Sequence, residues 1–485
     1  DMALSPGSVT ETVQVSAESN SLINTASPNL STTLNTQEVT DLPNNGRNPY
    51  VMVTLAPGVI STTGNYFQAK SSQYTNPYSG TAVAVVVDGS GGHNRLLLDG
   101  IPNDAAERFS GASYTNFVPS PEAVQEVTVQ NGIYDAQIGH GNGTVTNTVV
   151  RSGSNSLHGA AYYVFQNTYL DANTYEKAAA NQPRNNNQVN QTGFVLDGPV
   201  YIPKVYNGRN KTFFMVSFER YATHTAINYS TRLPTADELK GDFSALCSSF
   251  NSNGLCTSGV QLYDPLSGVD ANGNRTTYFP YNNIASRINA TGAAMASYLP
   301  SPNVPGATAL TNPNYISTQT SYPSTYPSFI VRFDQAIGQN NKLNVIFFRS
   351  GLTQNYPLQG FPKGIGPTNS STGYGYNVYR NNRGGSVDDV QQFSSTMVLD
   401  SRLGLVYHPF GLVYPGNANF DLSSKLGMTT AGLPYNTFPG EYMNSDGYAG
   451  LAPGAGGQIS ENTVGSLDEI LTKVWGRHSV RFGWE

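Results

Sequence analysis

The chain of 485 residues is long enough for two or three domains, but its composition is not that of a soluble globular protein. Only 12% of the residues are charged, against about 25% in soluble domains, and the chain holds 30 Tyr, 21 Phe and 49 Gly. The net charge of −6 argues against a nucleic-acid partner, which would require a basic face. No apolar run approaches the roughly 18 residues of a membrane helix, so a membrane protein of this sequence must be a β-barrel.

The first 17 residues predict two short strands about a Pro6-Gly7 turn. Alternating valines in the second strand suit pairing with a strand of another protein, in which the main chain provides the affinity. The residues of this segment are Glu11, Thr12, Val13, Gln14 and Val15, followed by Ser16 and Ala17. The chain begins at Asp1 rather than Met, and we expect it to be a fragment whose N-terminus has been removed.

Residues 31–151 predict a small α/β segment with many turns. Asn44, Asn45 and Gly46 form a turn signal, and Pro49 can open a helix whose apolar positions face a core. We expect these positions to be Val51, Met52 and Leu55. Two strand-like runs follow, at 83–87 and 95–98, and each is followed by Asp-Gly. Asp99-Gly100 is interpreted as a turn rather than as a ligand contact.

The stretch from Pro121 to Asn167 changes character in its middle. Residues 126–130 and 144–150 predict two β-branched strands, and residues 152–155 predict a polar turn. From Leu157 onward the pattern becomes aromatic alternation and continues to the last residue. Phe214, Val216 and Phe218, for example, alternate with Ser217 and Glu219. A two-residue period with charges confined to one face is what lipid outside and water inside require.

The connections between these strands alternate in length. Short polar turns are predicted at 207–211, 338–342 and 476–478, and long loops at 223–327, 352–385 and 408–460. Outer-membrane barrels show this asymmetry, with short turns on the periplasmic side and long loops outside. The only two cysteines, Cys247 and Cys256, lie close together in the first long loop. They indicate either a disulfide formed in an oxidising compartment or two incidental thiols.

The stretch from Pro121 to Asn167 resembles the junction between the plug and the barrel of TonB-dependent outer-membrane receptors, specifically the Oar-like group. The residues that match the typical sequence of this junction, in order, are Ala123 to Gln130, Tyr134, Gly139, Asn147, Ser152-Gly153, Asn155 and His158-Gly159. The stretch from Leu42 to Val59 matches a second pattern of the group, LPLNGRN followed by PGV, and residues 97–100 match its LLDG strand and turn. Gln137, Arg151 and Asn142-Gly143 depart from the usual glutamate, lysine and double glycine.

The resemblance implies a mainly β fold: a small α/β plug domain followed by an incomplete antiparallel transmembrane β-barrel with long extracellular loops. Residues 1–20 would then be either a TonB box, the segment that pairs with the inner-membrane protein TonB, or the last hairpin of a carboxypeptidase-regulatory-like β-domain. Residues 21–156 would be the plug and residues 157–485 the partial barrel. The plug-motif residues are Asn45, Gly46, Arg47, Asn48, Asp99 and Gly100.

By the same resemblance, the function is uptake of an unknown substrate across the outer membrane of a Gram-negative-type bacterium, gated by the plug. The expected partners are the TonB complex, the substrate and outer-membrane lipid. The alternative is a surface protein that binds partners through its long loops and transports nothing. We find no catalytic constellation and no zinc spacing among the six His, so we expect neither an enzyme nor a metal or cofactor site.

The number of strands sets a last expectation. About 22 strands surround the plug in large transporters, whereas the alternation from Leu157 onward predicts only eight to ten. We therefore expect an open, curved sheet around part of the plug. Its first strand (157–167) and its last (479–485) would be unpaired edges, and direct pairing between them would indicate a small closed barrel instead.

Overall fold

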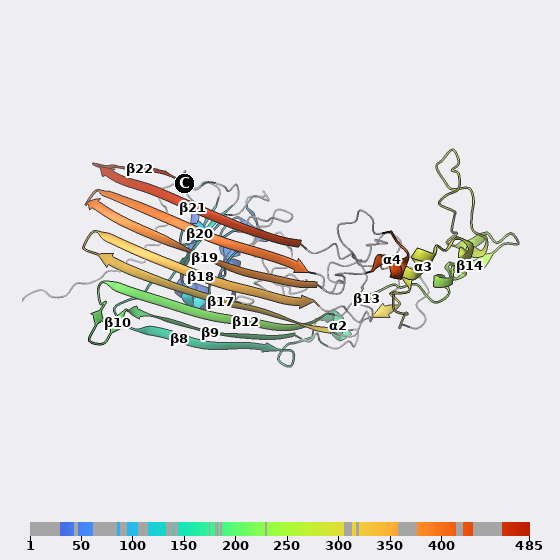
Figure 1. Cartoon of the computed structure of the whole chain (residues 1–485), viewed down its shortest axis with the longest axis horizontal. Helices are drawn as coiled ribbons and strands as arrows, with labels where there is room; N and C mark the ends of the chain where they lie inside the picture. The colour runs from blue at the N-terminus through green and yellow to red at the C-terminus, as the bar shows by residue number, and fades with distance from the viewer. Residues whose placement is uncertain are drawn as a thin grey trace, which may run out of the picture.

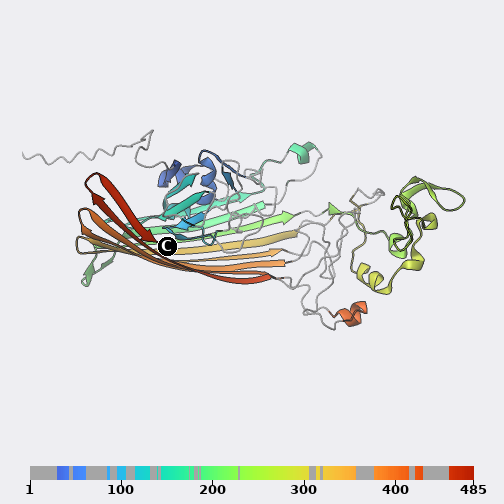
Figure 2. The same ribbon diagram turned by 90° about the horizontal axis from the view of Figure 1, so that it is seen from above.

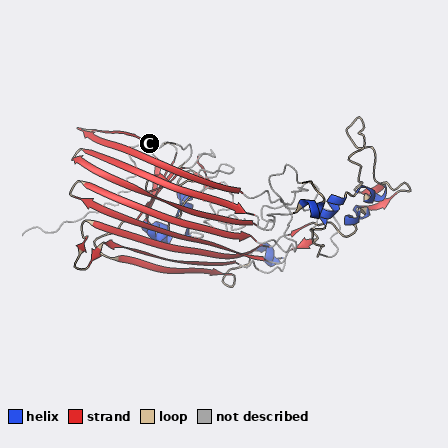
Figure 3. Cartoon of the chain, viewed as in Figure 1, coloured by secondary structure: helices blue, strands red, loops and turns tan. Residues whose placement is uncertain are grey.

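The computed structural model describes residues 30–42, 47–61, 85–87, 95–104, 115–131, 139, 144–173, 175–179, 184, 187–227, 230–304, 313–316, 320–356, 376–413, 421–429 and 458–485. The described part is mainly β, with a few short helices (Figure 3). Within these ranges, none of the helices has the length and apolar character needed to cross a membrane. The expected segment 11–15 and two motif residues, Asn45 and Gly46, lie outside the described residues.

A small five-stranded sheet forms the N-terminal part of the structure. Its strands, in spatial order, are β1 (Leu30–Asn35), β6 (Val124–Asn131), β7 (Val145–Val150), β4 (Arg95–Leu98) and β5 (Ile101–Pro102). Only the β4–β7 pair is parallel. Its other elements are α1 (Thr36–Asp41), the 3-10 helices η2 (Pro49–Leu55) and η3 (Pro121–Ala123), and the paired strands β2 (Val59–Ser61) and β3 (Val85–Val87).

The helices of this part begin where the sequence provides caps. The Asn35 side chain accepts from the Glu38 backbone N–H at 3.0 Å, and the Glu38 carboxylate accepts from the Asn35 N–H at 2.8 Å, which forms a capping box for α1. Asn48 caps η2 in the same way, by accepting from the Tyr50 N–H at 3.0 Å, and Pro49 stands at its first position. The predicted helix after Pro49 therefore exists, but it is 3-10 rather than α.

The type of helix corrects the predicted inward face of this segment. Met52 is buried as expected, whereas Leu55 is 52% exposed, so that prediction was wrong. A 3-10 helix has three residues per turn, which places every third side chain on one face. Tyr50, Val53 and Ala56 follow this period and are all buried.

The remainder of the chain forms one large antiparallel sheet of nine strands (Figure 1). In spatial order its strands are β8 (His158–Asn167), β9 (Asn187–Pro199), β12 (Thr212–Ile227), β17 (Thr320–Ile337), β18 (Asn341–Tyr356), β19 (Tyr376–Ser394), β20 (Met397–Val413), β21 (Gln458–Trp475) and β22 (His478–Trp484). Strands β8 and β22 are the two edges and do not pair with each other. The sheet is thus open, as expected, and the small closed barrel is excluded for this chain.

The large sheet is curved, and the small sheet lies against its inner face (Figure 2). Side chains alternate between the two faces along each strand, as the sequence predicts. On β12, Met215, Ser217 and Glu219 are buried on the inner face. The outer face carries exposed apolar side chains on neighbouring strands, among them Phe194, Leu196, Phe329, Phe333, Phe347, Leu403 and Leu405.

The strands are longer than predicted, and the loops are correspondingly shorter. Strand β12 continues to Ile227 and β17 begins at Thr320, while the second and third loops span 357–375 and 414–457. The predicted short turns at 338–342 and 476–478 are hairpin turns. The turn predicted at 207–211 is part of a longer connection that contains a hairpin of β10 (Tyr201–Ile202) and β11 (Tyr206–Asn207).

The first long loop is folded rather than structureless. It contains two pairs of strands, β13 (Ser230–Thr231) with β16 (Tyr315–Ile316) and β14 (Cys247–Phe250) with β15 (Cys256–Gly259). Its helices are η4 (Glu238–Lys240), η5 (Ser244–Leu246), η6 (Pro280–Asn282), η7 (Ala285–Arg287) and α3 (Ala290–Ala296). Helix α3 packs against α4 (Leu422–Leu426) of the third loop, beyond the end of the sheet (Figure 1). The remaining helix, α2 (Tyr175–Ala179), lies between β8 and β9 in sequence.

Candidate functional site at the interface of the two sheets

An apolar core joins the small sheet to the inner face of the large one. Phe117 of the small-sheet part packs on Phe348 of β18, with ring centroids 4.7 Å apart. The other buried members are Leu98, Ile101, Ala123 and Val150 on one side, and Val195, Met215, Ile330, Ile346 and Val406 on the other. Full burial of one such large apolar side chain stabilises by about 1.5–3 kcal/mol. The two sheets are therefore held together by a genuine core.

Hydrogen bonds of the segment 115–123 fix its position on the large sheet. The Val118 N–H donates to the Tyr326 hydroxyl at 3.0 Å, and the Ser120 and Ser217 hydroxyls are 3.1 Å apart. The Asn382 amide donates to the backbone carbonyl of Asn116. These partners belong to β12, β17 and β19, so the segment is fixed to the middle of the large sheet.

The Asp99-Gly100 turn between β4 and β5 also reaches the large sheet. Arg332 of β17 donates from Nη1 to Asp99 Oδ1 at 3.0 Å and to the Val150 carbonyl at 3.1 Å. The Val150 N–H donates to Asp99 Oδ2 at 3.1 Å, so each carboxylate oxygen has a partner. Asp99 is thus both the predicted turn residue, with φ of 46°, and an anchor on the large sheet. The Asp-Gly sequence predicts only the first of these roles.

Burial dominates the electrostatics of Asp99. Its side chain is 11% exposed, and this desolvation raises the pKa of Asp99 to about 6, against the opposing attraction of Arg332. Arg332 is itself held by Asp334, from Nε to Oδ1 at 2.9 Å. The guanidinium is consequently shared between a carboxylate of its own strand and one of the small sheet.

A second arginine, Arg402 of β20, lies over the glycine of the same turn. A Cβ on Gly100, whose φ is 83°, would overlap the Arg402 guanidinium. Arg402 is held by Asp388 of β19 at 3.2 Å and by Asp400 of its own strand at 3.4 Å. The tip of the turn therefore sits between two arginines that the large sheet holds in place. The φ of 83° favours glycine at this position.

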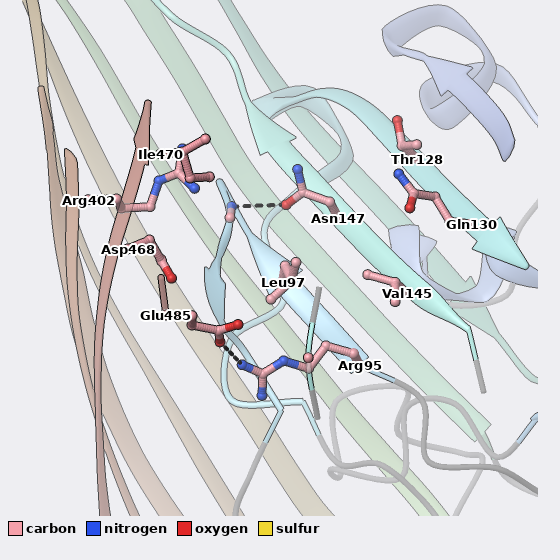
Figure 4. A pocket seen from close by; sticks show the side chains of 12 residues that line it. Arg95, Leu97, Thr128, Gln130, Val145, Asn147, Arg402, Asp468, Ile470 and Glu485 are labelled. Carbon is pink, nitrogen blue, oxygen red and sulfur yellow. Dashed lines mark hydrogen bonds and ion pairs between the residues drawn. The ribbon is translucent and has the colours of Figure 1, made fainter. Parts of the chain in front are cut away.

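A pocket of about 200 Å³ lies beside the turn, between the small sheet and strands β20 and β21 (Figure 4). Its polar lining comes from both sheets and includes Arg95, Asn147, Arg402, Asp468 and Glu485. The Asn147 side chain accepts from the Gly100 N–H at 3.0 Å, and Arg95 bonds Glu485 at 3.4 Å. On this side the interface thus contains a cavity that is lined by both polar and apolar side chains.

The two described residues of the Asn-Gly-Arg-Asn motif lie at the other end of the interface. Arg47 pairs with Glu122, and its guanidinium lies over the Tyr162 ring of β8, 4.7 Å from the centroid. The Tyr162 hydroxyl donates to Glu219 of β12. Asn48 is the helix cap described above. The motif therefore connects the 3-10 helix to the first strands of the large sheet, a link that its sequence spacing does not reveal.

The expected cysteine pair is bonded in the structure, with the two sulfurs 2.04 Å apart. It closes a small loop at the tip of the first long loop, far from the interface of the two sheets (Figure 1). Among the described residues, no group of three or more His, Cys, Asp or Glu could hold a metal ion.

Sequence reasoning missed the two arginines that contact the turn. Arg332 alternates with the exposed Phe333, and Arg402 with the exposed Leu403, so the two-residue period places both arginines on the inner face. A charged side chain on an inner face requires a partner, and this requirement is the signal that could have identified them. The partner itself lies 233 positions away, so no local pattern can name it.

An antiparallel sheet whose outer face carries exposed apolar side chains, alternating with side chains that point inward, is characteristic of transmembrane β-barrel proteins. Residues 149–485 match the family model of the outer membrane beta barrel domain. The chain belongs to this family, and its place is the outer membrane. A comparison with curated protein sequences returned no match.

Comparison with solved structures finds similarity to outer-membrane proteins. The outer-membrane transporter YddB of Escherichia coli superposes with a TM-score of 0.52 at 10% identity, over 93% of this chain and 47% of YddB. The ferric enterobactin receptor PfeA of Pseudomonas aeruginosa gives 0.47 at 12% identity, over 94% and 48%. The ferripyoverdine receptor of the same organism gives 0.42 at 13%, over 94% and 51%. The chain spans about half the length of these proteins.

Proposed function

We propose that this chain is the plug and part of the barrel of a TonB-dependent outer-membrane transporter of the Oar-like group. Residues 21–156 are the plug and residues 157–485 the barrel segment in this proposal. The observation that carries it is the position of the small sheet, which fills the inner face of the large sheet and is sealed to it by a shared core. The similarity in fold to the transporter YddB supports the same class.

In this function the plug blocks the barrel at rest and moves when TonB pulls on the chain that precedes it. Residues 11–15 are the proposed contact with TonB, although the last hairpin of a preceding domain explains them too. The long loops receive the substrate on the cell surface. The Tyr and Asn residues of these loops suit oligosaccharides, peptides or metal chelates as the substrate.

The test begins with a competition screen of labelled oligosaccharides, peptides and metal chelates on intact cells that carry the protein. Uptake of the ligand that binds is then measured in matched cells with and without TonB. A transporter accumulates ligand only when TonB is present, because binding at the surface supplies no energy for passage. Equal accumulation in both strains would remove the proposal.

A second candidate is a surface protein that binds a partner and transports nothing. The folded first loop favours it, because its disulfide and its packing against α4 give a rigid exposed surface. Surface binding without TonB-dependent accumulation would be the result expected of such a protein. Hydrolysis assays with glycans and peptides test the remaining possibility of an enzyme.

A further inference from the structure

Two arginines stand side by side on the outer face of the large sheet. Arg349 of β18 and Arg383 of β19 are exposed, and they alternate with the buried residues Phe348, Ser350 and Asn382. In the register of the two strands they are directly opposite each other. The Cβ atoms of opposed residues are about 4.5–5.5 Å apart, and like charges at such positions are destabilising. An anion that binds both arginines would therefore stabilise this face.

The pair lies at the loop-side end of the apolar part of the outer face. Between the arginines and the short turns, two successive cross-strand rows of outward positions carry apolar side chains or glycine: Val331, Phe347, Gly385 and Leu405 in the first, and Phe333, Val345, Val387 and Leu403 in the second. The next row is polar on three strands, at Gln335, Asp389 and Ser401. Long loops of outer-membrane barrels are extracellular, so the arginines belong to the outer leaflet.

The depth of the pair places it at the level of lipid headgroups. Asp389, in the polar row, follows Arg383 by six positions. This is about 20 Å along a strand, and less along the membrane normal because barrel strands tilt by about 35–45°. The apolar band of outer-membrane barrels is about 25 Å tall. Both arginines thus lie at the boundary between hydrocarbon and headgroups, where a guanidinium without a counter-charge is costly.

Neighbouring side chains orient both guanidiniums without neutralising them. Arg349 donates from Nε to Asn381 Oδ1 at 3.1 Å, and its two terminal nitrogens have no further partner among the described residues. The Arg383 guanidinium lies over the Tyr407 ring of β20, 4.7 Å from the centroid. An amide and an aromatic ring carry no net charge. The two arginines are therefore held in place with their positive charge intact.

Carboxylates of the outer face do not neutralise the pair either. The outward positions of the described strands carry three of them, Asp389, Glu461 and Glu469. Asp389 and Glu469 lie in the polar row near the short turns, and Glu461 is bonded to the Tyr407 hydroxyl. Arg220 of β12, also exposed, adds a third positive charge at the loop-side end. Within the described strands, this end of the outer face is thus positively charged.

We propose that Arg349 and Arg383 bind the phosphate group of an outer-leaflet lipid, whose acyl chains lie against the two apolar rows. Guanidinium groups bind phosphate through paired hydrogen bonds, which an ammonium group cannot match in geometry. The inference concerns the lipid around the sheet and does not rest on the proposed transport function.

The apolar positions below the arginines favour a lipid over a free anion. Phe347 and Leu405 flank Gly385 in the first apolar row, and they are 47% and 58% exposed. A Cβ on Gly385 would overlap the Ile346 carbonyl oxygen, so this position leaves the two flanking side chains uncovered. An acyl chain removes their apolar surface from water, whereas an inorganic anion cannot.

The first experiment measures lipid binding by native mass spectrometry of the full-length protein, purified in a non-ionic detergent. The probe is lipid A, a glycolipid with two phosphates, and the comparison is the same lipid after removal of both phosphates. We expect retention of lipid A to exceed that of the dephosphorylated lipid several-fold. Arg349→Gln/Arg383→Gln should abolish most of this difference. Arg209→Gln removes the same kind of charge from an exposed turn at the opposite end of the strands and is the matched control without effect.

Excess inorganic phosphate distinguishes a lipid site from a simple anion site. It should not displace lipid A from the wild-type protein, because the acyl chains remain bound to the apolar rows. Displacement by phosphate, or equal retention of the two lipids, would overturn the proposal. Release of a co-purified protein by the double substitution, without any change in bound lipid, would also overturn it and indicate an acidic protein partner.

The second experiment follows folding of the full-length protein into phosphatidylcholine vesicles with and without lipid A, by heat-modifiable mobility on a gel. Without lipid A, Arg349→Gln/Arg383→Gln should fold at least as well as the wild type, since two charges are removed from the lipid-facing surface. Lipid A should increase the folded fraction of the wild type several-fold more than that of the variant. An equal increase in both proteins would contradict the site. Failure of the variant to fold in either vesicle would contradict it too, because the arginines would then be needed for the structure itself.

Discussion

At the scale of single residues, Asp99 shows how a turn signal can hide a long-range role. Asp-Gly is a common turn sequence, and that interpretation is correct for its backbone. The carboxylate, however, is committed to Arg332, and its burial costs more than the pairing returns. A prediction about pH follows from this balance.

The folded-state pKa of Asp99, about 6, lies above its ordinary value of 3.8. The stability that comes from protonating this group is therefore present below pH 3.8 and is lost as the pH rises through about 6. Relative to Asp99→Asn, which does not titrate, the wild-type free energy of unfolding should fall by roughly 3 kcal/mol across this interval. Thermal unfolding of both proteins in detergent between these pH values measures the difference, and a constant difference would contradict the assignment.

The bond between Cys247 and Cys256 is a second prediction at this scale. The loop it closes is short, so the bond should stabilise by about 2 to 3 kcal/mol at most, and only at the tip of the first long loop. Cys256→Ser should leave barrel assembly unchanged. Mass spectrometry of exported protein under non-reducing conditions decides the matter, since two alkylatable thiols would rule out the bond.

At the scale of elements, the alternation of apolar and polar side chains predicts which of them face outward. This prediction can be tested on one strand. Val387 and Phe393 are both exposed on β19, one in its middle and the other near its end. An arginine at the bilayer midplane costs about 2–4 kcal/mol, and near the interface about 0–1 kcal/mol. Val387→Arg should therefore impair folding into lipid vesicles far more than Phe393→Arg. Equal effects would show that this face does not contact lipid.

The segment 11–16 carries the second prediction about an element. Its deletion should abolish uptake and leave surface binding of ligand intact, if it is the strand that pairs with TonB. Uptake and binding are measured on the same cells. Normal transport by the deletion variant would assign the segment to a preceding β-domain.

The sequence predicted the strands well and their ends poorly. Alternation is imposed by lipid on one face and the lumen on the other, so it fades where a hairpin rises above the membrane. Residues 376–383, Tyr-Asn-Val-Tyr-Arg-Asn-Asn-Arg, have little apolar alternation, yet β19 pairs there with β18. Leu55 was wrongly predicted to face inward for another local reason, because the helix is 3-10 and its period of three residues differs from that of an α-helix.

At the scale of the whole molecule, the contact between the two sheets could not be predicted from local patterns. Arg332 and Asp99 meet only because nine strands curve around the small sheet. The resemblance to TonB-dependent receptors implied such an enclosure, but it assigned no residue to it. The pocket beside the turn is likewise formed by side chains from both sheets, and no stretch of sequence contains it.

The proposed plug, the small sheet, should move under the action of TonB, and the pocket allows that movement to be measured directly. Leu97→Cys places a thiol in the wall of the pocket. Its labelling by a membrane-impermeant maleimide is measured on intact cells with bound ligand, in the presence and absence of TonB. We expect labelling to rise several-fold only when TonB is present. Equal labelling in the two strains would contradict it.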